Sequence, residues 1–184
     1  MNRIVFLDRD GVINACAAGR YVNTVDDFEF LPGALHALRE LAALPVRVCV
    51  ASNQGGVGRG HLSEEVLWDI TDYMVRVIAA AEGRINAVYY CLHAPEDACD
   101  CRKPAPGLLL RGMREHGADS ADCWMIGDHE TDLRAANAAG VKAIMVLTGR
   151  YDGAGAEHGY LDGIVPVVAN LRAAVTLIAR ELGA

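Results

Sequence analysis

Short runs of apolar residues alternate along this chain with longer segments in which apolar residues recur at helical spacing. The short runs are bounded by polar residues and turn formers, a pattern typical of strands that are buried on both faces of a sheet. They predict strands at residues 4–7, 46–51, 85–90, 123–126, 143–147 and 164–168.

The segments between these runs predict helices. Leucines recur at helical spacing between Pro32 and Pro45, and Pro45 ends that helix. Ser63 and Asn170 stand at positions where an N-cap residue is favoured. The predicted helices cover residues 34–44, 63–82, 107–116, 135–139 and 170–182.

Strands that alternate with helices favour an α/β fold, a Rossmann-like parallel sheet with helices on both faces. We predict one domain over residues 1–184, because no repeat, low-complexity tract or long linker divides the chain. Residues 12–30 lack a helical period and directly follow the first strand, so we expect them to form a flap over or beside the site. No pattern in the glycine-rich loop at residues 150–163 indicates a function for it.

Composition and charge narrow the classes of function. The 184 residues are 52% hydrophobic and 22% charged, as in an ordinary globular domain. A net charge of −7 without any basic run argues against a nucleic-acid partner, because phosphate backbones are held by clustered Lys and Arg. With neither a secretory signal nor a membrane-length apolar run, we expect a cytoplasmic protein. Its six cysteines are then expected to be reduced thiols or metal ligands.

Carboxylates follow two of the predicted strands. Asp8 and Asp10 come directly after the first strand, and Asp128 and Asp132 come after the fourth. The carboxyl ends of parallel strands meet at the edge of the sheet where ligands bind. Solvated turns are the alternative, since Asp-x-Asp-Gly is also favourable turn chemistry. The convergence of these acids favours an oxygen-rich site suited to Mg²⁺.

A second polar segment follows the second predicted strand. Ser52, Asn53 and Gln54 precede a glycine-rich stretch at residues 55–60. Glycines can leave backbone N–H groups free to point at an anion, which predicts a phosphate-binding loop. A flexible loop is the alternative. The spacing is not that of a nucleotide-type P-loop.

Two short pairs of soft ligands flank one loop. Cys91 and His93 form the first pair, and Cys99 and Cys101 form the second. Three thiolates and one imidazole are a donor set that tetrahedral Zn²⁺ accepts. We therefore expect a closed, structural zinc site in a loop that covers residues 91–103.

Two cations, Arg102 and Lys103, directly follow the last predicted zinc ligand. A loop fixed by a metal would hold them rigidly against an anionic substrate. The alternative is a pair of solvated charges. Together with the Ser52 hydroxyl and the glycine amides, Lys103 would supply donors that grip a phosphate.

Four of these motifs resemble those of the haloacid dehalogenase (HAD) superfamily of phosphatases, and they occur in the same order. They are Asp8-Arg9-Asp10-Gly11, Ser52-Asn53-Gln54, Arg102-Lys103-Pro104 and the pair Asp128 and Asp132. The Cys/His loop joined to Arg102-Lys103-Pro104 is similar to that of a narrower group, the D,D-heptose bisphosphate and histidinol-phosphate phosphatases. That resemblance implies a small enzyme with a zinc loop and without a large cap domain.

The resemblance implies a role for each motif. Asp8 would take the phosphoryl group as an aspartyl phosphate, and Asp10 would protonate the leaving alcohol and later activate water. Mg²⁺ would be held by Asp8, by the backbone carbonyl of Asp10 and by Asp128. Ser52 and Lys103 would bind the transferring phosphoryl group.

Four further positions follow from the same resemblance. Asn53, Gln54 and Arg102 would bind the phosphate or the rest of the substrate, and Asp132 would orient Lys103 or a metal-bound water. His129 stands where heptose phosphatases commonly have Lys, and it is given no role.

The resemblance also implies a substrate, the 7-phosphate of D-glycero-D-manno-heptose 1,7-bisphosphate, on the way to nucleotide-activated heptose. Arg102 suits such a doubly charged sugar, and Tyr21-Val22 and Phe28-Glu29-Phe30 resemble the heptose branch. Histidinol phosphate is the alternative substrate. The alternative of another class is a zinc-stabilised binding protein without catalysis, which the presence of both Asp8 and Asp10 disfavours. We expect a monomer.

Overall fold

The computed structural model describes residues 2–15, 22–149 and 165–184, and its strands form one parallel sheet. The strands are β1 (Ile4–Leu7), β2 (Arg47–Asn53), β3 (Ala87–Cys91), β4 (Cys123–Gly127), β5 (Lys142–Val146) and β6 (Val167–Val168). They lie in the order β3-β2-β1-β4-β5-β6, and each neighbouring pair is parallel. The predicted α/β fold is confirmed.

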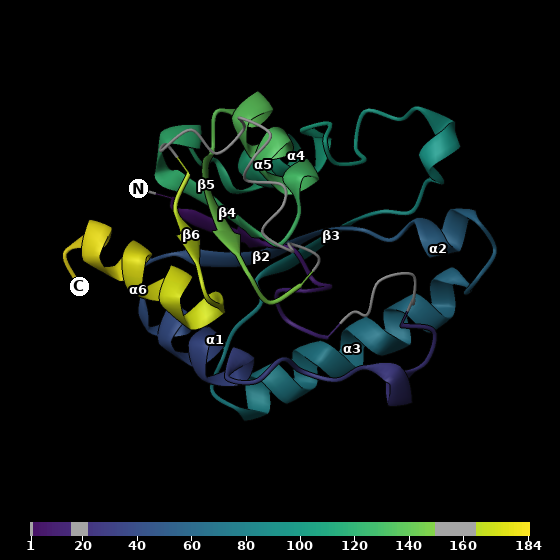
Figure 1. Ribbon diagram of the computed structural model, residues 1–184, viewed down its shortest axis with the longest axis horizontal. Helices are drawn as coiled ribbons and strands as arrows, with labels where there is room; N and C mark the ends of the chain where they lie inside the picture. Colours follow the sequence, from purple (N-terminus) through teal and green to yellow (C-terminus); the bar gives the residue numbers. More distant parts are fainter. Residues whose placement is uncertain (1, 16–21, 150–164) are drawn as a thin grey trace.

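Helices cover both faces of this sheet. They are α1 (Ala34–Ala43), α2 (Gly55–Gly58), α3 (Glu64–Ala80), α4 (Gly107–His116), α5 (Glu130–Ala139) and α6 (Leu171–Leu182). Single 3-10 turns are η1 (Val25–Asp27), η2 (Pro95–Asp97) and η3 (Ser120–Asp122). Figure 1 shows α1, α3 and α6 on one face and α4 and α5 on the other. Within the described ranges, no helix has the length and the apolar content needed to cross a bilayer.

Alternation along the strands builds a separate apolar core on each face. Val5 and Leu7 of β1 pack in one buried cluster with side chains of α1, α3 and α6. Ile4 and Phe6 point to the other face and pack with α4 and α5. Because successive side chains of a strand point to opposite faces, an unbroken apolar run serves both cores at once.

Two predicted caps fix where helices begin. The Ser63 hydroxyl accepts a hydrogen bond from the Val66 N–H at 3.2 Å, at the start of α3. The Asn170 side-chain carbonyl accepts one from the Ala173 N–H at 3.1 Å, at the start of α6. Each cap satisfies a backbone donor that the first turn of a helix leaves unpaired.

Several predicted boundaries are wrong. β2 continues beyond residue 51, because Ser52 and Asn53 pair with Tyr90 and Cys91 in the ladder to β3. β3 begins at Ala87 and not at residue 85, β5 lies one residue earlier than predicted, and, within the described residues, β6 is confined to residues 167–168 of the predicted 164–168. The helix predicted at 135–139 begins five residues earlier, at residue 130. The predicted loop at 150–163, Cys16, Tyr21 and Ile164 lie outside the described residues.

The strand order fixes where a site can form. The chain places β2 and β3 on one side of β1 and β4 and β5 on its other side. Connections that leave β1 and β4 in opposite directions open a crevice beyond their carboxyl ends. Asp8 and Asp128 each follow one of these two strands directly.

Candidate active site

Three carboxylates meet at the carboxyl ends of β1 and β4. Asp8 follows β1, Asp128 follows β4, and Asp132 lies in the first turn of α5. One oxygen from each lies within 4.8 Å of the others, so the three form an acidic cluster. Asp128 is 1% exposed and Asp132 is fully buried. The strand ends therefore bring together acids that are far apart in the sequence.

Lys103 bridges two members of the acidic cluster. Its Nζ lies 3.1 Å from Asp8 Oδ1 and 2.5 Å from Asp132 Oδ1, and it donates to the Ala51 carbonyl at 2.8 Å. Burial alone would lower the pKa of Lys103, but the charges of Asp132 and Asp8 outweigh burial and raise it. Lys103 therefore stays a cation beside Asp8, where it can also attract a phosphate.

Asn53 fixes the backbone of Lys103. Its Nδ2 donates to the Lys103 carbonyl at 2.9 Å, and its Oδ1 accepts from the Lys103 N–H at 3.0 Å. This reciprocal pair ties β2 to the segment that follows the Cys/His loop. The structure thus shows the Asn53 amide holding Lys103, and its predicted contact with substrate stays a prediction.

Asp10 is held by a set of donors. Asn14 Nδ2 donates to Asp10 Oδ1 at 2.9 Å, and Gln54 Nε2 donates to Oδ2 at 2.8 Å. Arg9 forms an ion pair with the same carboxylate at 3.0 Å. Burial alone would raise the pKa of Asp10, but the charge of Arg9 and these amide hydrogen bonds outweigh it and lower the pKa. Asp10 is therefore a carboxylate at neutral pH.

Gln54 also donates to the Ser52 hydroxyl at 3.2 Å. Its amide therefore links Asp10 to the end of β2. The structure shows Gln54 supporting Asp10 and Ser52, and its predicted contact with a phosphate stays a prediction. The Ser52 side chain is buried at the floor of the cavity described next.

A cavity of about 590 Å³ opens over these residues. Asp8, Asp10, Ser52, Asn53, Lys103 and Asp128 line its floor, and Arg59, Arg102, His129 and Thr131 lie around it. The loop that carries the predicted zinc ligands supplies Pro95, Ala98 and Cys99 to its wall. The predicted catalytic acids and the Cys/His loop therefore face the same cavity.

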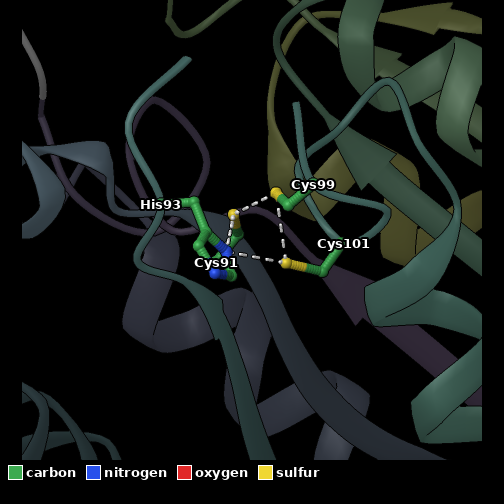
Figure 2. Close-up of side chains that lie close together, drawn as sticks. All are labelled: Cys91, His93, Cys99 and Cys101. Carbon is green, nitrogen blue, oxygen red and sulfur yellow. Dashed lines mark hydrogen bonds between the residues drawn. The ribbon is translucent and has the colours of Figure 1, made fainter. Parts of the chain in front are cut away.

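The four predicted zinc ligands come together in space. Figure 2 shows Cys91, His93, Cys99 and Cys101 pointing toward one another, and their ligand atoms lie within 4.8 Å. The His93 Nδ1 lies 3.6 Å from the Cys91 sulfur and 3.3 Å from the Cys101 sulfur. The Cys99 sulfur lies 3.6 Å from Cys91 and 3.5 Å from Cys101. We call these four residues the Cys/His cluster.

The donors of the Cys/His cluster fit a divalent cation. Burial alone would raise the pKa of Cys99, but hydrogen bonds from the backbone of Arg102 and from Cys101 outweigh it and lower the pKa to about 7. Burial and the neighbouring thiols raise the pKa of Cys101 to about 12. Three thiolates this close repel one another, and a bound Zn²⁺ would remove that repulsion.

Comparison with known proteins places this arrangement in a family. A family model described as HAD-hydrolase-like matches residues 100–174. The chain is 37% identical to D-glycero-beta-D-manno-heptose-1,7-bisphosphate 7-phosphatase of Haemophilus influenzae, over 90% of this chain and 94% of that protein. It is 36% identical to the Pseudomonas aeruginosa protein of the same name, over 80% of this chain and 82% of that protein. The chain belongs to the heptose-bisphosphate phosphatase family of HAD-like hydrolases.

Solved structures of this family share the fold. The D,D-heptose 1,7-bisphosphate phosphatase from B. bronchiseptica, complexed with magnesium and phosphate, matches with a TM-score of 0.91 and 35% identity. The match covers 97% of this chain and 99% of that one. The enzyme from Burkholderia thailandensis matches with a TM-score of 0.74 and 33% identity, over 96% and 98% of the two chains.

The acidic cluster fits a magnesium ion, the metal in the B. bronchiseptica complex. Its oxygen-only donor set is the kind that Mg²⁺ prefers, with few carboxylates and room for other oxygen ligands. Gly11 has φ +87°, and a Cβ on Gly11 or on Gly149 would overlap the Asp128 carboxylate. Two backbone segments without side chains thus leave space for the buried Asp128 carboxylate.

The structure limits the predicted phosphate-binding loop at residues 55–60, and anion binding by its remaining amides stays a prediction. Residues 55–58 form the short helix α2, and the amides of Gly58 and Gly60 donate to the carbonyls of Leu92 and Val57. A Cβ on Gly58 would lie 2.5 Å from the Ala94 nitrogen. This glycine therefore lets α2 pack closely against the Cys/His loop, and its amide is not available to an anion.

The described parts of the predicted flap do not line the cavity. Val12, Ile13 and Phe28 are buried in the core, and the Phe28 ring packs edge-on against Tyr73 of α3 at 6.0 Å. Residues 12–15 and 22–30 therefore pack against the α3 face. Whether residues 16–21 cover the site lies outside the described part of the chain.

Sequence reasoning missed Arg9, Asn14 and Arg59. Arg9 and Asn14 hold Asp10, and Arg59 lines the cavity and pairs with Glu96 at 3.3 Å. In the sequence, Arg9 stands between two acids and would be expected to be exposed, since Arg is mostly exposed in proteins. His129, which was given no role, lines the cavity and caps α5 by accepting from the Thr131 N–H at 3.3 Å.

Proposed function

We propose that this chain removes the 7-phosphate of D-glycero-D-manno-heptose 1,7-bisphosphate through an aspartyl-phosphate intermediate. The observation that carries the proposal is the meeting of Asp8, Lys103 and the acidic cluster in one cavity. A carboxylate can attack a phosphate only where nearby positive charge offsets the repulsion between them. The choice of a sugar bisphosphate as the substrate is supported by the names of the relatives.

In the first half of the reaction, an Asp8 oxygen attacks phosphorus and the bond to the sugar oxygen breaks. Lys103 holds the phosphoryl oxygens beside Asp8, and Ser52 offers its hydroxyl from the cavity floor. Asp10 gives a proton to the departing sugar oxygen. Because Asp10 rests as a carboxylate, that proton enters with the substrate, whose phosphate group has a second pKa of about 6.

In the second half, Asp10 takes a proton from a water molecule and that water attacks phosphorus. The bond between phosphorus and Asp8 breaks, phosphate leaves with the proton that Asp10 took from water, and both Asp8 and Asp10 return to their starting state. The lowered pKa of Asp10 suits this step, because a base must be deprotonated when it acts.

We propose that Asp8, Asp128 and the backbone carbonyl of Asp10 hold Mg²⁺, with Asp132 orienting Lys103. When bound, this ion supplies positive charge that offsets the charge of the phosphoryl group. The magnesium and phosphate in the B. bronchiseptica complex support this assignment. The contact of Lys103 with Asp132 supports the role given to Asp132.

We propose that the Cys/His cluster holds a structural Zn²⁺. Its Cys99 lines the cavity, and Cys101 directly precedes Arg102 and Lys103. A metal there would fix the loop from which both cations reach the cavity. Its closed set of four protein ligands leaves no position for substrate.

The charges around the cavity favour a bisphosphate over histidinol phosphate. Two arginines, Arg59 and Arg102, are among the described side chains that line the cavity. Two guanidinium groups suit a second phosphate, whereas the ammonium group of histidinol phosphate would face repulsion.

We further propose that residues 1–184 act as one domain, with a zinc loop of about residues 91–103 and with the expected flap of about residues 12–30, whose described parts lie beside the site and do not line the cavity. We also propose that the protein is a cytoplasmic monomer. Its partner would be a small sugar phosphate, and it would bind neither nucleic acid nor a membrane. The net charge of −7 and the single sheet of the described strands support it. Sedimentation analysis would contradict the monomer if a dimer dominated at working concentration.

The test is phosphate release from heptose 1,7-bisphosphate and from histidinol phosphate, side by side with Mg²⁺. We expect wild type to turn over the bisphosphate faster, and Asp8→Asn to be inactive on both substrates. Asp26→Asn is the matched control, because Asp26 is an exposed carboxylate in η1 outside the cavity lining. Faster release from histidinol phosphate would contradict the proposed substrate. No release from either compound would contradict the proposal that this chain is a phosphatase.

A further inference from the structure

Arg9 is a buried cation directly behind the cavity. Its side chain is 1% exposed, and it does not belong to the described residues that line the cavity. Its guanidinium faces Asp10: Nε donates to Oδ1 at 3.2 Å, and Nη2 lies 3.0 Å from both carboxylate oxygens. A planar guanidinium that meets both oxygens fixes the plane of the carboxylate as well as its position.

The other side of the Arg9 guanidinium is backed by an aromatic ring. The Arg9 Cζ lies 5.9 Å from the centre of the Tyr90 ring, within the range of a cation–π contact. The Tyr90 hydroxyl lies 3.0 Å from the Thr71 hydroxyl, and Thr71 donates to the Leu67 carbonyl at 2.7 Å. Since Thr71 gives its proton to Leu67, Tyr90 is the donor to Thr71. The ring that supports Arg9 is thereby anchored to α3.

The backbone of Arg9 adds a further constraint. Its carbonyl accepts from the N–H groups of Ile13 at 2.9 Å and of Asn14 at 3.2 Å. The same turn delivers the Asn14 amide to Asp10. The backbone and the side chain of Arg9 therefore both help to fix the position of the Asp10 carboxylate.

We infer that Arg9 is a positioning residue, which acts on the reaction only through Asp10. The inference rests on the proposed function, in which Asp10 moves protons at the sugar oxygen and at water. Proton transfer needs the carboxylate within hydrogen-bond reach of these oxygens. Without the guanidinium, the Asp10 carboxylate keeps only the amides of Asn14 and Gln54, which leave it free to tilt.

The test is a double-mutant cycle that combines Arg9→Met with Asp10→Asn. Arg9→Met alone is expected to lower kcat about 10- to 100-fold, because a misplaced catalytic group costs that much, with KM unchanged. In the Asp10→Asn background the same change is expected to cause no further loss, since residues that act as a unit are not additive. Arg9→Lys, which keeps the charge and loses the planar fork, is expected to recover part of kcat.

Arg111→Met is the matched control. Arg111 stacks over Tyr89 at 5.4 Å and pairs with Glu115 at 2.8 Å, but it is exposed on α4 and does not line the cavity. We expect it to leave kcat and KM unchanged. Thermal unfolding of each variant separates a loss of folding from a loss of rate, and Arg9→Lys carries the test if Arg9→Met does not fold.

Three results would overturn the inference. An equal loss from the Arg9 change with and without Asp10 would show that Arg9 acts elsewhere. A raised KM with unchanged kcat would make Arg9 a binding residue, and unchanged kinetics would leave it no role in the reaction. Full activity of Asp10→Asn alone would instead contradict the proposed function itself.

Discussion

The acidic cluster and the Cys/His cluster lie against the same cavity but are held in different ways. Asp8 and Asp128 follow β1 and β4, which have a partner strand on both sides. In the Cys/His cluster only Cys91 lies in a strand, the edge strand β3, and the rest is carried by a loop with one 3-10 turn. The core therefore fixes the acidic cluster, whereas the order of the Cys/His loop depends on its ligand atoms.

The largest effect is expected from Lys103→Met. It leaves the carboxylates of Asp8 and Asp132 without their buried cation, and breaking a buried ion pair costs about 3–5 kcal/mol of unfolding free energy. Denaturant titration measures the loss. Lys142→Met is the control, because Lys142 pairs with Glu181 at the surface, and an exposed pair contributes at most about 1 kcal/mol. Equal losses would show that the acidic cluster does not depend on Lys103.

Removing a ligand of the Cys/His cluster should lower activity more than it lowers the stability of the fold. Cys99→Ser is expected to lose the bound zinc and to lower kcat/KM about 10- to 100-fold, because the loop that positions Arg102 and Lys103 loosens. The check is elemental analysis, which we expect to find one zinc per chain in wild type and less in the variant. Cys49→Ala, in the core of β2, should keep its zinc. A fully active, zinc-free Cys99→Ser would contradict the role of the cluster.

A smaller effect is expected where backbone approaches the acidic cluster. In Gly149→Ala the new Cβ displaces the Asp128 carboxylate, since the space there is already filled. The Mg²⁺ concentration for half-maximal activity should rise about tenfold, as it does when the support of a metal ligand is lost. Gly33→Ala is the control, because a Cβ there meets nothing within 4 Å. An unchanged Mg²⁺ requirement would contradict the proposal that Asp128 is a ligand of the metal.

The smallest effect is expected at the start of α5, beside the acidic cluster. His129→Ala removes the side-chain acceptor of the Thr131 N–H and should cost about 1 kcal/mol of unfolding free energy. His129→Asn, which keeps an acceptor at the cap, should retain most of that stability. If both variants lost the same amount, the cap would not be the contribution of His129.

The sequence predicted what its local patterns encode. Apolar runs that end in acids placed Asp8 and Asp128 at strand ends, and the spacing of Cys91 to Cys101 brought four ligands together. It could not reveal partners brought close only by folding. Asn53 binds the backbone of Lys103, which is 50 residues away along the chain, and no pattern near Asn53 encodes that contact.

Burial of a charged residue was equally hidden. An Arg between two acids looks solvated in a sequence, yet Arg9 is 1% exposed because Asp10 and Tyr90 surround it. The glycine-rich stretch was ambiguous for a related reason. Gly58 packs against the Cys/His loop, and a sequence does not distinguish a glycine that permits packing from one that exposes its amide.

The central claim is that Asp8 becomes phosphorylated. The direct measurement is to mix wild-type enzyme with an excess of heptose 1,7-bisphosphate and Mg²⁺, quench during turnover with sodium borohydride, and analyse peptides by mass spectrometry. Borohydride reduces an aspartyl phosphate to homoserine. Wild type is used because Asp10 acts in both halves of the proposed reaction, so its loss would slow formation of the intermediate as well as its hydrolysis. Homoserine at position 8, and at no other aspartate, is the predicted result. Phosphate release without any modified residue, or homoserine at position 128 or 132, would contradict the account.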